Sequence, residues 1–295
     1  YEKGCEVVNP GWPESEIIPE PLSAGEKDSI DQAVAAAKNA DIIIAVLGED
    51  EKRVGESLSR SSLDLPGRQE QLLEALYATG KPVVLVLITG QPLTINWANR
   101  FVPAILEAGF PGPQGGKAIA EALFGDYNPG GRLSVTYPKT VGQIEFNFPF
   151  KPGSQANQPN GKDPNGGGKT RVNGPLYPFG FGLSYTNFEY SNLLVSPETQ
   201  AINGNIEVSV EVKNTGKTKG DEVVQLYIKD VLSSVTTYES ELRGFQRIGL
   251  LPGEKKTVKF TISPDDLKLY NKNMDWVVEP GKFEVLIGSS STDIR

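Results

Sequence analysis

The sequence predicts an α/β domain with a mainly parallel sheet, followed by an antiparallel β-sandwich. Between Ser23 and Tyr137, helical spacings of apolar residues alternate with short continuous apolar runs, which is the pattern of βαβ units. From about Leu183 onward, apolar residues instead recur at every second position, as in half-buried antiparallel strands. A stretch rich in Pro, Gly, Asn and Gln at 151–169 separates the two patterns. We therefore expect an α/β domain over 1–137, a long interdomain loop over 138–182 and a β-sandwich over 183–295.

The elements of the α/β domain can be placed in order. A helix is expected over 23–39, because Ser23 and Glu26 have the spacing of a capping box. The apolar run at 41–47 has no polar face and predicts a parallel strand covered on both sides. Leucines at helical spacing predict a second helix over 69–79. The other elements expected are strands at 82–88, 103–108 and 132–137 and a helix at 115–124.

The prediction of the second domain is based on two segments in which apolar and polar residues alternate. Apolar and polar residues alternate along 206–213 and again along 257–262. Turn signals such as Pro252-Gly253 and Pro280-Gly281 separate the apolar runs. This pattern indicates a sandwich of about seven strands. Because Cys5 is the single cysteine, the sandwich lacks the cysteine pair of an antibody domain.

Composition excludes several classes of function. The chain has 29 Lys and Arg against 37 Asp and Glu, a net charge of −8, so it lacks the basic surface that nucleic acids attract. It has no histidine, so it supplies neither a Ser-His-Asp relay nor a His-ligated metal site, and we expect no cofactor. No apolar run is long enough to span a membrane. Carboxylates, lysines, tyrosines and hydroxyls are left for catalysis.

One dense polar cluster follows the strand at 41–47. The segment 48–60 places four carboxylates and three cations at the carboxyl end of that strand, where ligands gather in parallel sheets. A charged loop is most often a solvated surface. Within it, Gly55 permits an unusual backbone before Glu56, and Arg60 is near enough in sequence to steady a carboxylate. Glu56 is suited to protonating a glycosidic oxygen if its surroundings raise its pKa.

A series of motifs then gives this loop a context. They are Gly48-Glu-Asp50, Val54-Gly-Glu-Ser57, Leu65-Pro-Gly-Arg-Gln69, Phe124-Gly-Asp-Tyr-Asn-Pro-Gly-Gly-Arg-Leu133, Tyr177-Pro-Phe-Gly-Phe-Gly-Leu-Ser-Tyr185 and Glu241-Leu-Arg-Gly-Phe245. In this order they resemble the carboxyl-terminal half of glycoside hydrolase family 3, the β-glucosidase family. The last motif resembles that family's fibronectin type III-like terminal domain. The resemblance covers nearly the whole chain.

The resemblance implies a retaining, exo-acting hydrolase of terminal β-D-glucosyl residues. An Asp nucleophile attacks the anomeric carbon while a Glu acts first as acid and then as base. The position that matches this Glu is Glu56, with Arg60 as a supporting residue and Arg53 as a further candidate near the substrate. The family's nucleophile lies on an amino-terminal (β/α)8 barrel, a pattern not found here. We therefore expect this chain alone to be inactive and its α/β domain to lack its first strands.

The resemblance also bears on location and on the long loop. It implies a periplasmic or extracellular enzyme, and it suggests that the arm at 146–151 packs near the mouth of the barrel. A rival interpretation is a non-catalytic carbohydrate-binding or scaffold protein with the same architecture. A flavodoxin-like small-molecule binder is disfavoured, because no phosphate-cradling glycine loop follows any strand.

Overall fold

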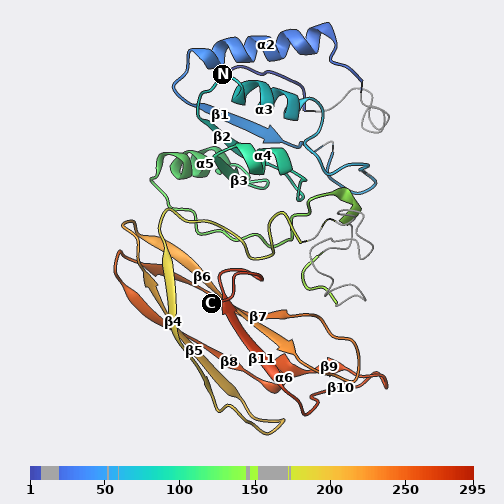
Figure 1. Ribbon diagram of the computed structural model, residues 1–295, viewed down its shortest axis with the longest axis vertical. Helices are drawn as coiled ribbons and strands as arrows, with labels where there is room; N and C mark the ends of the chain where they lie inside the picture. The colour runs from blue at the N-terminus through green and yellow to red at the C-terminus, as the bar shows by residue number, and fades with distance from the viewer. Residues whose placement is uncertain (8–19, 52, 59, 144–146, 152–171, 173) are drawn as a thin grey trace, which may run out of the picture. The chain divides into compact units, whose positions relative to one another are not determined.

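The structure is a computed structural model, and its described residues form two compact units (Figure 1). The described residues are 1–7, 20–51, 53–58, 60–143, 147–151, 172 and 174–295. The first unit, called here the α/β unit, comprises 1–121 and 137–143. The second, called the sandwich unit, comprises 122–136 and 144–295. The segment 122–136, expected in the α/β domain, thus packs with the sandwich.

The α/β unit is built on a parallel three-stranded sheet in the order β1-β2-β3. Its edge strand β1 is connected to β2 by α3, and β2 to β3 by α4, as in βαβ units. Tyr77 of α3 contacts Trp97 of α4 edge-on, with ring centroids 5.5 Å apart, so these two helices lie side by side. The elements are α2 (Ala24–Lys38), β1 (Ile43–Gly48), α3 (Gln69–Tyr77), β2 (Val83–Ile88), α4 (Asn96–Phe101), β3 (Ala104–Glu107), α5 (Gly115–Phe124) and the 3-10 turn η1 (Val141–Gln143).

Strand β1 is covered on one face only, which corrects the expectation of two covered faces. Ile43 and Ala45 are buried, whereas Ile44 and Val46 on the opposite face are 42% and 55% exposed. An apolar sequence on both faces predicts two covering layers. In the part of the chain that the structure describes, only one of these layers covers β1.

One further expectation for this region is corrected, and one helix was not expected. The segment 132–137 is not a strand of the parallel sheet. The Leu133 N–H donates to the Phe181 carbonyl at 2.8 Å, and the Gly180 N–H donates to the Leu133 carbonyl at 2.7 Å, so the start of this segment pairs within the sandwich unit. Its alternating pattern fits such a half-buried pairing better than a strand buried on both faces. Helix α4 was not expected, because its six residues carry too little periodicity.

Helix α2 begins with the expected capping box. The Ser23 Oγ accepts from the Glu26 N–H at 3.2 Å, and the Glu26 carboxylate accepts from the Ser23 N–H at 2.7 Å. Arg68 donates to the same carboxylate at 2.9 Å. The backbone hydrogen bond from Ser23, followed by the one from Arg68, lowers the pKa of Glu26 from 4.5 to about 2. The Glu26 carboxylate of the cap therefore stays charged well into the acidic pH range.

We expect Glu26 to make the chain sensitive to acid. Its pKa is lower in the folded state, so its stabilising effect is present above pH 4.5 and is lost as the pH falls towards about 2. The effect is less than about 1 kcal/mol, because the side chain is 32% exposed. Urea unfolding at neutral pH and at about pH 3 should show a smaller pH dependence for Glu26→Gln than for the unmodified chain. If the variant and the unmodified chain lose the same stability between the two pH values, Glu26 is not the group that causes the acid sensitivity.

The sandwich unit consists of two antiparallel sheets, β4-β5-β8 and β11-β6-β7, with a small β9-β10 hairpin. The alternations at 206–213 and 257–262 are confirmed as β5 and β8. Val208, Val210 and Val212 of β5 are at most 2% exposed and belong to the core between the sheets. The elements are β4 (Phe188–Ser196), β5 (Ile206–Asn214), β6 (Gly220–Asp230), β7 (Glu241–Leu250), β8 (Lys255–Ile262), α6 (Pro264–Leu267), β9 (Leu269–Tyr270), β10 (Trp276–Val277) and β11 (Phe283–Gly288).

A buried ion pair fastens the segment 122–136 to the sandwich. Arg132 Nη2 lies 2.6 Å from Glu222 Oε2, and the two side chains are 7% and 2% exposed. The Tyr190 hydroxyl donates to the other oxygen of Glu222 at 2.7 Å, so the buried carboxylate is bonded on both sides. This arrangement explains why 122–136 belongs to the second unit.

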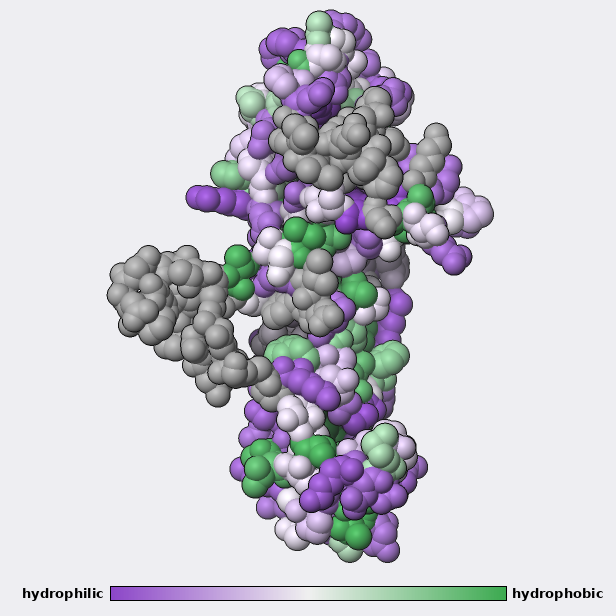
Figure 2. All heavy atoms as spheres, turned by 90° about the vertical axis from the view of Figure 1, so that its right-hand side faces the viewer, coloured by the Kyte–Doolittle hydropathy of each residue, from purple (hydrophilic) through white to green (hydrophobic). Residues whose placement is uncertain are grey.

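Residues 147–151 of the long loop also belong to the sandwich unit, whereas 138–143 belong to the α/β unit. Phe148 stacks on Phe179 with ring centroids 4.7 Å apart. Phe146 lies outside the described residues, and an approach of this arm to a barrel stays a prediction. On the face seen in Figure 2, hydrophilic residues predominate and hydrophobic ones gather in small groups. In the described ranges, no helix combines the length and hydropathy needed to cross a bilayer.

Candidate active site

The carboxyl end of β1 is held by a close backbone contact and a buried amide. Gly48 has a φ of +139°, and a Cβ there would lie 1.9 Å from the Ile88 carbonyl oxygen, so only glycine fits. The Gln69 side chain accepts from the Gly48 N–H at 2.6 Å and donates to the Gly48 carbonyl at 2.7 Å. The loop that leaves the arrowhead of β1 therefore starts from a fixed point (Figure 1).

Glu49 is the first residue of this loop, and its side chain is fully buried. Its carboxylate forms an ion pair with Arg60 and accepts from Thr89 Oγ1 and Gln91 Nε2, both at 2.8 Å. Arg60 also donates to the carbonyls of Ser62 and Asp64, each at 3.0 Å. Buried charges need such partners. The pair joins the start of the loop to a point eleven residues later.

Glu56 lies between these anchors and is exposed. Its neighbours Gly55 and Ser57 have φ values of +155° and +65°, so the chain turns sharply on both sides of it. Its carboxylate has no hydrogen bond or ion pair with another described residue. The turn therefore exposes on the surface of the α/β unit a carboxylate that is not bonded to another described residue.

The middle of the loop packs against the segments that follow strands β2 and β3. A Cβ at Gly90 would lie 2.7 Å from the Phe110 ring and 2.9 Å from Val54, so both side chains pack directly on the Gly90 backbone. Gly90 follows β2 and Phe110 follows β3, as the strand bounds show. The carboxyl ends of all three strands thus contribute to the site.

The two predicted arginines are both largely buried in the α/β unit. Arg60 was expected to steady Glu56, but the structure pairs it with Glu49. Arg53 was expected near the substrate, yet it is 5% exposed, and burial lowers its pKa. Arg60 therefore anchors the loop from inside the unit, and Arg53 stays a predicted site residue. Sequence reasoning missed Glu49, although its place directly after a buried strand was a usable signal.

Hydrolysis of a glycoside needs a pair of carboxyl groups, and an exposed carboxylate such as that of Glu56 can serve as one of them. A retaining mechanism needs a second carboxylate about 5–5.5 Å from the first across the sugar. Over the described ranges, no three His, Cys, Asp or Glu side chains are grouped so that they could hold a metal. The chemistry that Glu56 can perform here is proton transfer.

Comparisons with known proteins agree with the motifs. Residues 7–185 match the glycosyl hydrolase family 3 C-terminal domain, and residues 222–291 match a fibronectin type III-like domain. A periplasmic β-glucosidase of Salmonella typhimurium is 44% identical over 90% of this chain and 35% of that protein. A β-xylosidase of Formosa agariphila is 43% identical over 99% of this chain and 37% of that protein.

Solved structures give the same result. The β-glucosidase from Listeria innocua in complex with glucose has a TM-score of 0.83 and 34% identity, over 93% of this chain and 38% of that one. The chain thus spans between a third and two fifths of the length of these relatives. The chain belongs to glycoside hydrolase family 3, of which it contains the C-terminal α/β domain and the fibronectin type III-like domain.

Proposed function

We propose that this chain is the carboxyl-terminal part of a retaining, exo-acting β-glucosidase in which Glu56 is the general acid/base. The observation that carries the proposal is the exposed Glu56 carboxylate, held between two turns on a loop whose ends are anchored. Rigid anchoring suits a group that must meet a substrate outside its own unit. The family resemblance supports the same assignment.

The proposed reaction has two steps. In the first, protonated Glu56 donates its proton to the glycosidic oxygen, while an Asp carboxylate on an upstream barrel bonds to the anomeric carbon and the aglycone leaves as an alcohol. In the second, the Glu56 carboxylate takes a proton from a water molecule, whose oxygen attacks the anomeric carbon and releases the Asp. Arg60 acts on neither bond and keeps the loop in place through its ion pair with Glu49.

The substrate class is proposed from the names of the relatives. They include both β-glucosidases and β-xylosidases, and we favour terminal β-linked glucosides. The periplasmic relative from Salmonella typhimurium supports a periplasmic or extracellular location. Measuring kcat/KM of the full-length protein on matched p-nitrophenyl β-D-glucoside and β-D-xyloside tests this choice. A preference for the xyloside would overturn it.

The 295-residue chain by itself is expected to be inactive, because the proposed Asp nucleophile lies on a barrel outside this chain. Incubating the purified chain with p-nitrophenyl β-D-glucoside should release no more nitrophenol than buffer does, whereas the full-length protein should release it rapidly. Hydrolysis by the chain alone would contradict the division of the catalytic pair. An inactive full-length protein that still binds saccharides would instead indicate the non-catalytic rival.

A further inference from the structure

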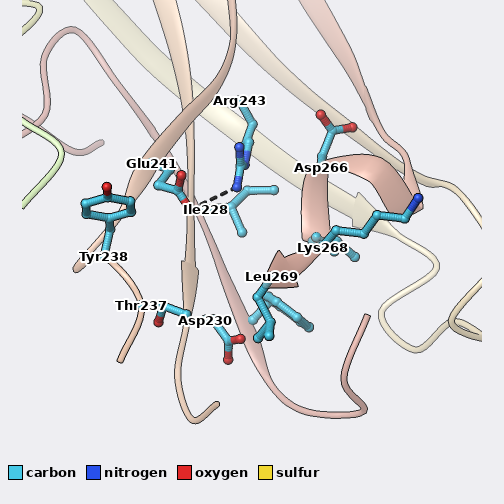
Figure 3. Close-up of a pocket in the computed structure, with 11 residues that line it drawn as sticks. Ile228, Asp230, Thr237, Tyr238, Glu241, Arg243, Asp266, Lys268 and Leu269 are labelled. Atoms are coloured by element: carbon cyan, nitrogen blue, oxygen red, sulfur yellow. Dashed lines mark hydrogen bonds and ion pairs between the residues drawn. The ribbon is translucent and has the colours of Figure 1, made fainter. Parts of the chain in front are cut away.

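The hollow drawn in Figure 3 lies in the sandwich unit and is too small for a saccharide. Its volume is about 30 Å³, which is room for one or two water molecules. Ile228 and Leu269, which line it, are only 6% and 8% exposed, so a larger ligand cannot reach them. A larger ligand therefore needs an open surface, and the surface beside Glu56 offers one.

Apolar side chains flank the turn that bears Glu56. Val54 stands two residues before Glu56, and Leu58 stands two residues after it. The Leu58 N–H donates to the Gly55 carbonyl at 3.2 Å, and a Cβ at Gly55 would lie 3.6 Å from the Leu58 side chain, so Leu58 folds back over the turn. Leu58 is nevertheless 38% exposed. The turn thus carries an apolar side chain on each side of the carboxylate.

Phe110 extends this apolar surface from the segment that follows β3. Its ring packs together with Val54 on the Gly90 backbone, where a Cβ would lie only 2.7 Å from the ring. The ring is still 52% exposed. A phenyl ring with this much free surface buries a large apolar area when a ligand covers it. Phe110 and Val54 therefore join the apolar surface to the Glu56 turn.

The turn that carries Phe110 is fixed on both sides of it. On one side, the half-buried Glu107 carboxylate accepts from the Gly109 N–H at 2.9 Å, and Gly109 has a φ of +59°, a conformation that favours glycine. On the other side, Pro111 packs on Gly115, where a Cβ would lie 2.4 Å from the proline ring. The exposed ring thus has a defined place beside the acid/base loop.

The position of the acid decides which part of a substrate meets this surface. A general acid gives its proton to the glycosidic oxygen, which becomes the oxygen of the leaving group. The nucleophile of a retaining enzyme attacks the opposite face of the anomeric carbon, so the leaving group departs on the side of the acid. Side chains beside Glu56 therefore meet the aglycone, which is the part of the substrate that follows the glycosidic oxygen.

We propose that Phe110, supported by Val54 and Leu58, contacts the aglycone and gives the enzyme a preference for β-glucosides with an apolar aglycone. The inference rests on the proposed role of Glu56 as the acid. An alkyl chain or aryl ring that covers Phe110 is removed from water together with the phenyl ring. A hydroxylated aglycone gains less, because none of these three side chains can form a hydrogen bond with it.

Hydrolysis of hexyl and methyl β-D-glucosides by the full-length protein tests this inference. Both substrates release a simple alkanol of similar acidity, so they need the same proton and differ in the apolar chain. We expect kcat/KM to be at least about 10-fold higher for the hexyl glucoside. Phe110→Ala should lower the hexyl-to-methyl ratio of kcat/KM by about 10-fold, because the hexyl chain loses its contact with the ring.

Two other variants separate the position of the ring from its general effect on the fold. Gly90→Ala places a methyl group where the Phe110 ring now packs, so it displaces the ring without removing it and should also lower the ratio. Phe101→Ala is the matched control. Phe101 is 38% exposed and ends α4 just before β3, so it lies at the other end of that strand from Phe110. The ratio should not change in this variant.

The outcomes that overturn the inference are distinct. If Phe110→Ala hydrolyses both glucosides with the ratio of the unmodified enzyme, Phe110 does not contact the aglycone, and the proposed role of Glu56 is untouched. An equal fall of the ratio in Phe101→Ala would show that the preference does not arise at Phe110. A full-length protein that hydrolyses neither glucoside would overturn the proposed function and this inference with it.

Discussion

Replacing Glu56 by alanine in the full-length enzyme is expected to slow hydrolysis of a glucoside with a poor leaving group by about 10²–10⁴. Such a substrate needs a proton on the departing oxygen. Dinitrophenolate departs without a proton from the enzyme, so the first step on a dinitrophenyl glucoside should lose much less of its rate. Comparing kcat/KM for methyl and dinitrophenyl β-D-glucosides gives the ratio directly. Glu56→Gln should behave in the same way, because an amide cannot donate a comparable proton.

The loop offers a matched control for this experiment. Glu51 is also an exposed carboxylate of the same loop, five residues earlier. Glu51→Ala removes one negative charge without touching the proposed acid, and both substrates should keep their rates. Equal losses on the two substrates in Glu56→Ala, or equal behaviour of the Glu51 and Glu56 variants, would contradict a role in proton transfer.

The second large effect concerns stability. Glu49→Gln is expected to lower the free energy of unfolding of the α/β unit by about 3–5 kcal/mol, because it leaves the guanidinium of Arg60 buried without its charge partner. The side chains of Glu49 and Arg60 are 0% and 8% exposed, so water cannot replace the lost contact. Urea denaturation of the chain, followed by circular dichroism, measures the change.

An exposed ion pair in the same region provides the control. Lys117 and Glu121 lie 3.5 Å apart on α5 with largely exposed side chains, and Glu121→Gln should cost less than about 1 kcal/mol. The double variant Glu49→Leu with Arg60→Met should recover much of the stability, because an apolar pair replaces a buried ionic one at little cost. Similar effects of Glu49→Gln and Glu121→Gln would show that the buried pair does not hold the loop.

Much of the fold could be predicted from local patterns. The capping box of α2 and the alternations of β5 and β8 are short-range signals, and the structure confirms them. The segment 132–137 was misplaced because its partner, at 180–181, lies far along the chain. Alternation shows that a segment is half-buried, but it does not tell which sheet covers it.

The position of Glu56 could be predicted from the sequence, whereas the buried network around Glu49 could not. The glycine before Glu56 signals an unusual turn, yet only the resemblance to a family singled out this carboxylate among the charges of the loop. The choice of Glu49 as the partner of Arg60 depends on Thr89 and Gln91, which reach it from the connection after β2. Such a network is formed by tertiary packing and leaves no periodic trace in the sequence.

The most direct measurement is chemical rescue of Glu56→Ala in the full-length enzyme with sodium azide. Removing the carboxylate leaves space and removes a negative charge beside the glycosyl-enzyme, so azide can attack the anomeric carbon in place of water. With dinitrophenyl β-D-glucoside, we expect the rate to rise with azide and the product to be β-D-glucosyl azide. No acceleration and no azide product, with the unmodified enzyme equally indifferent to azide, would contradict Glu56 as the acid/base.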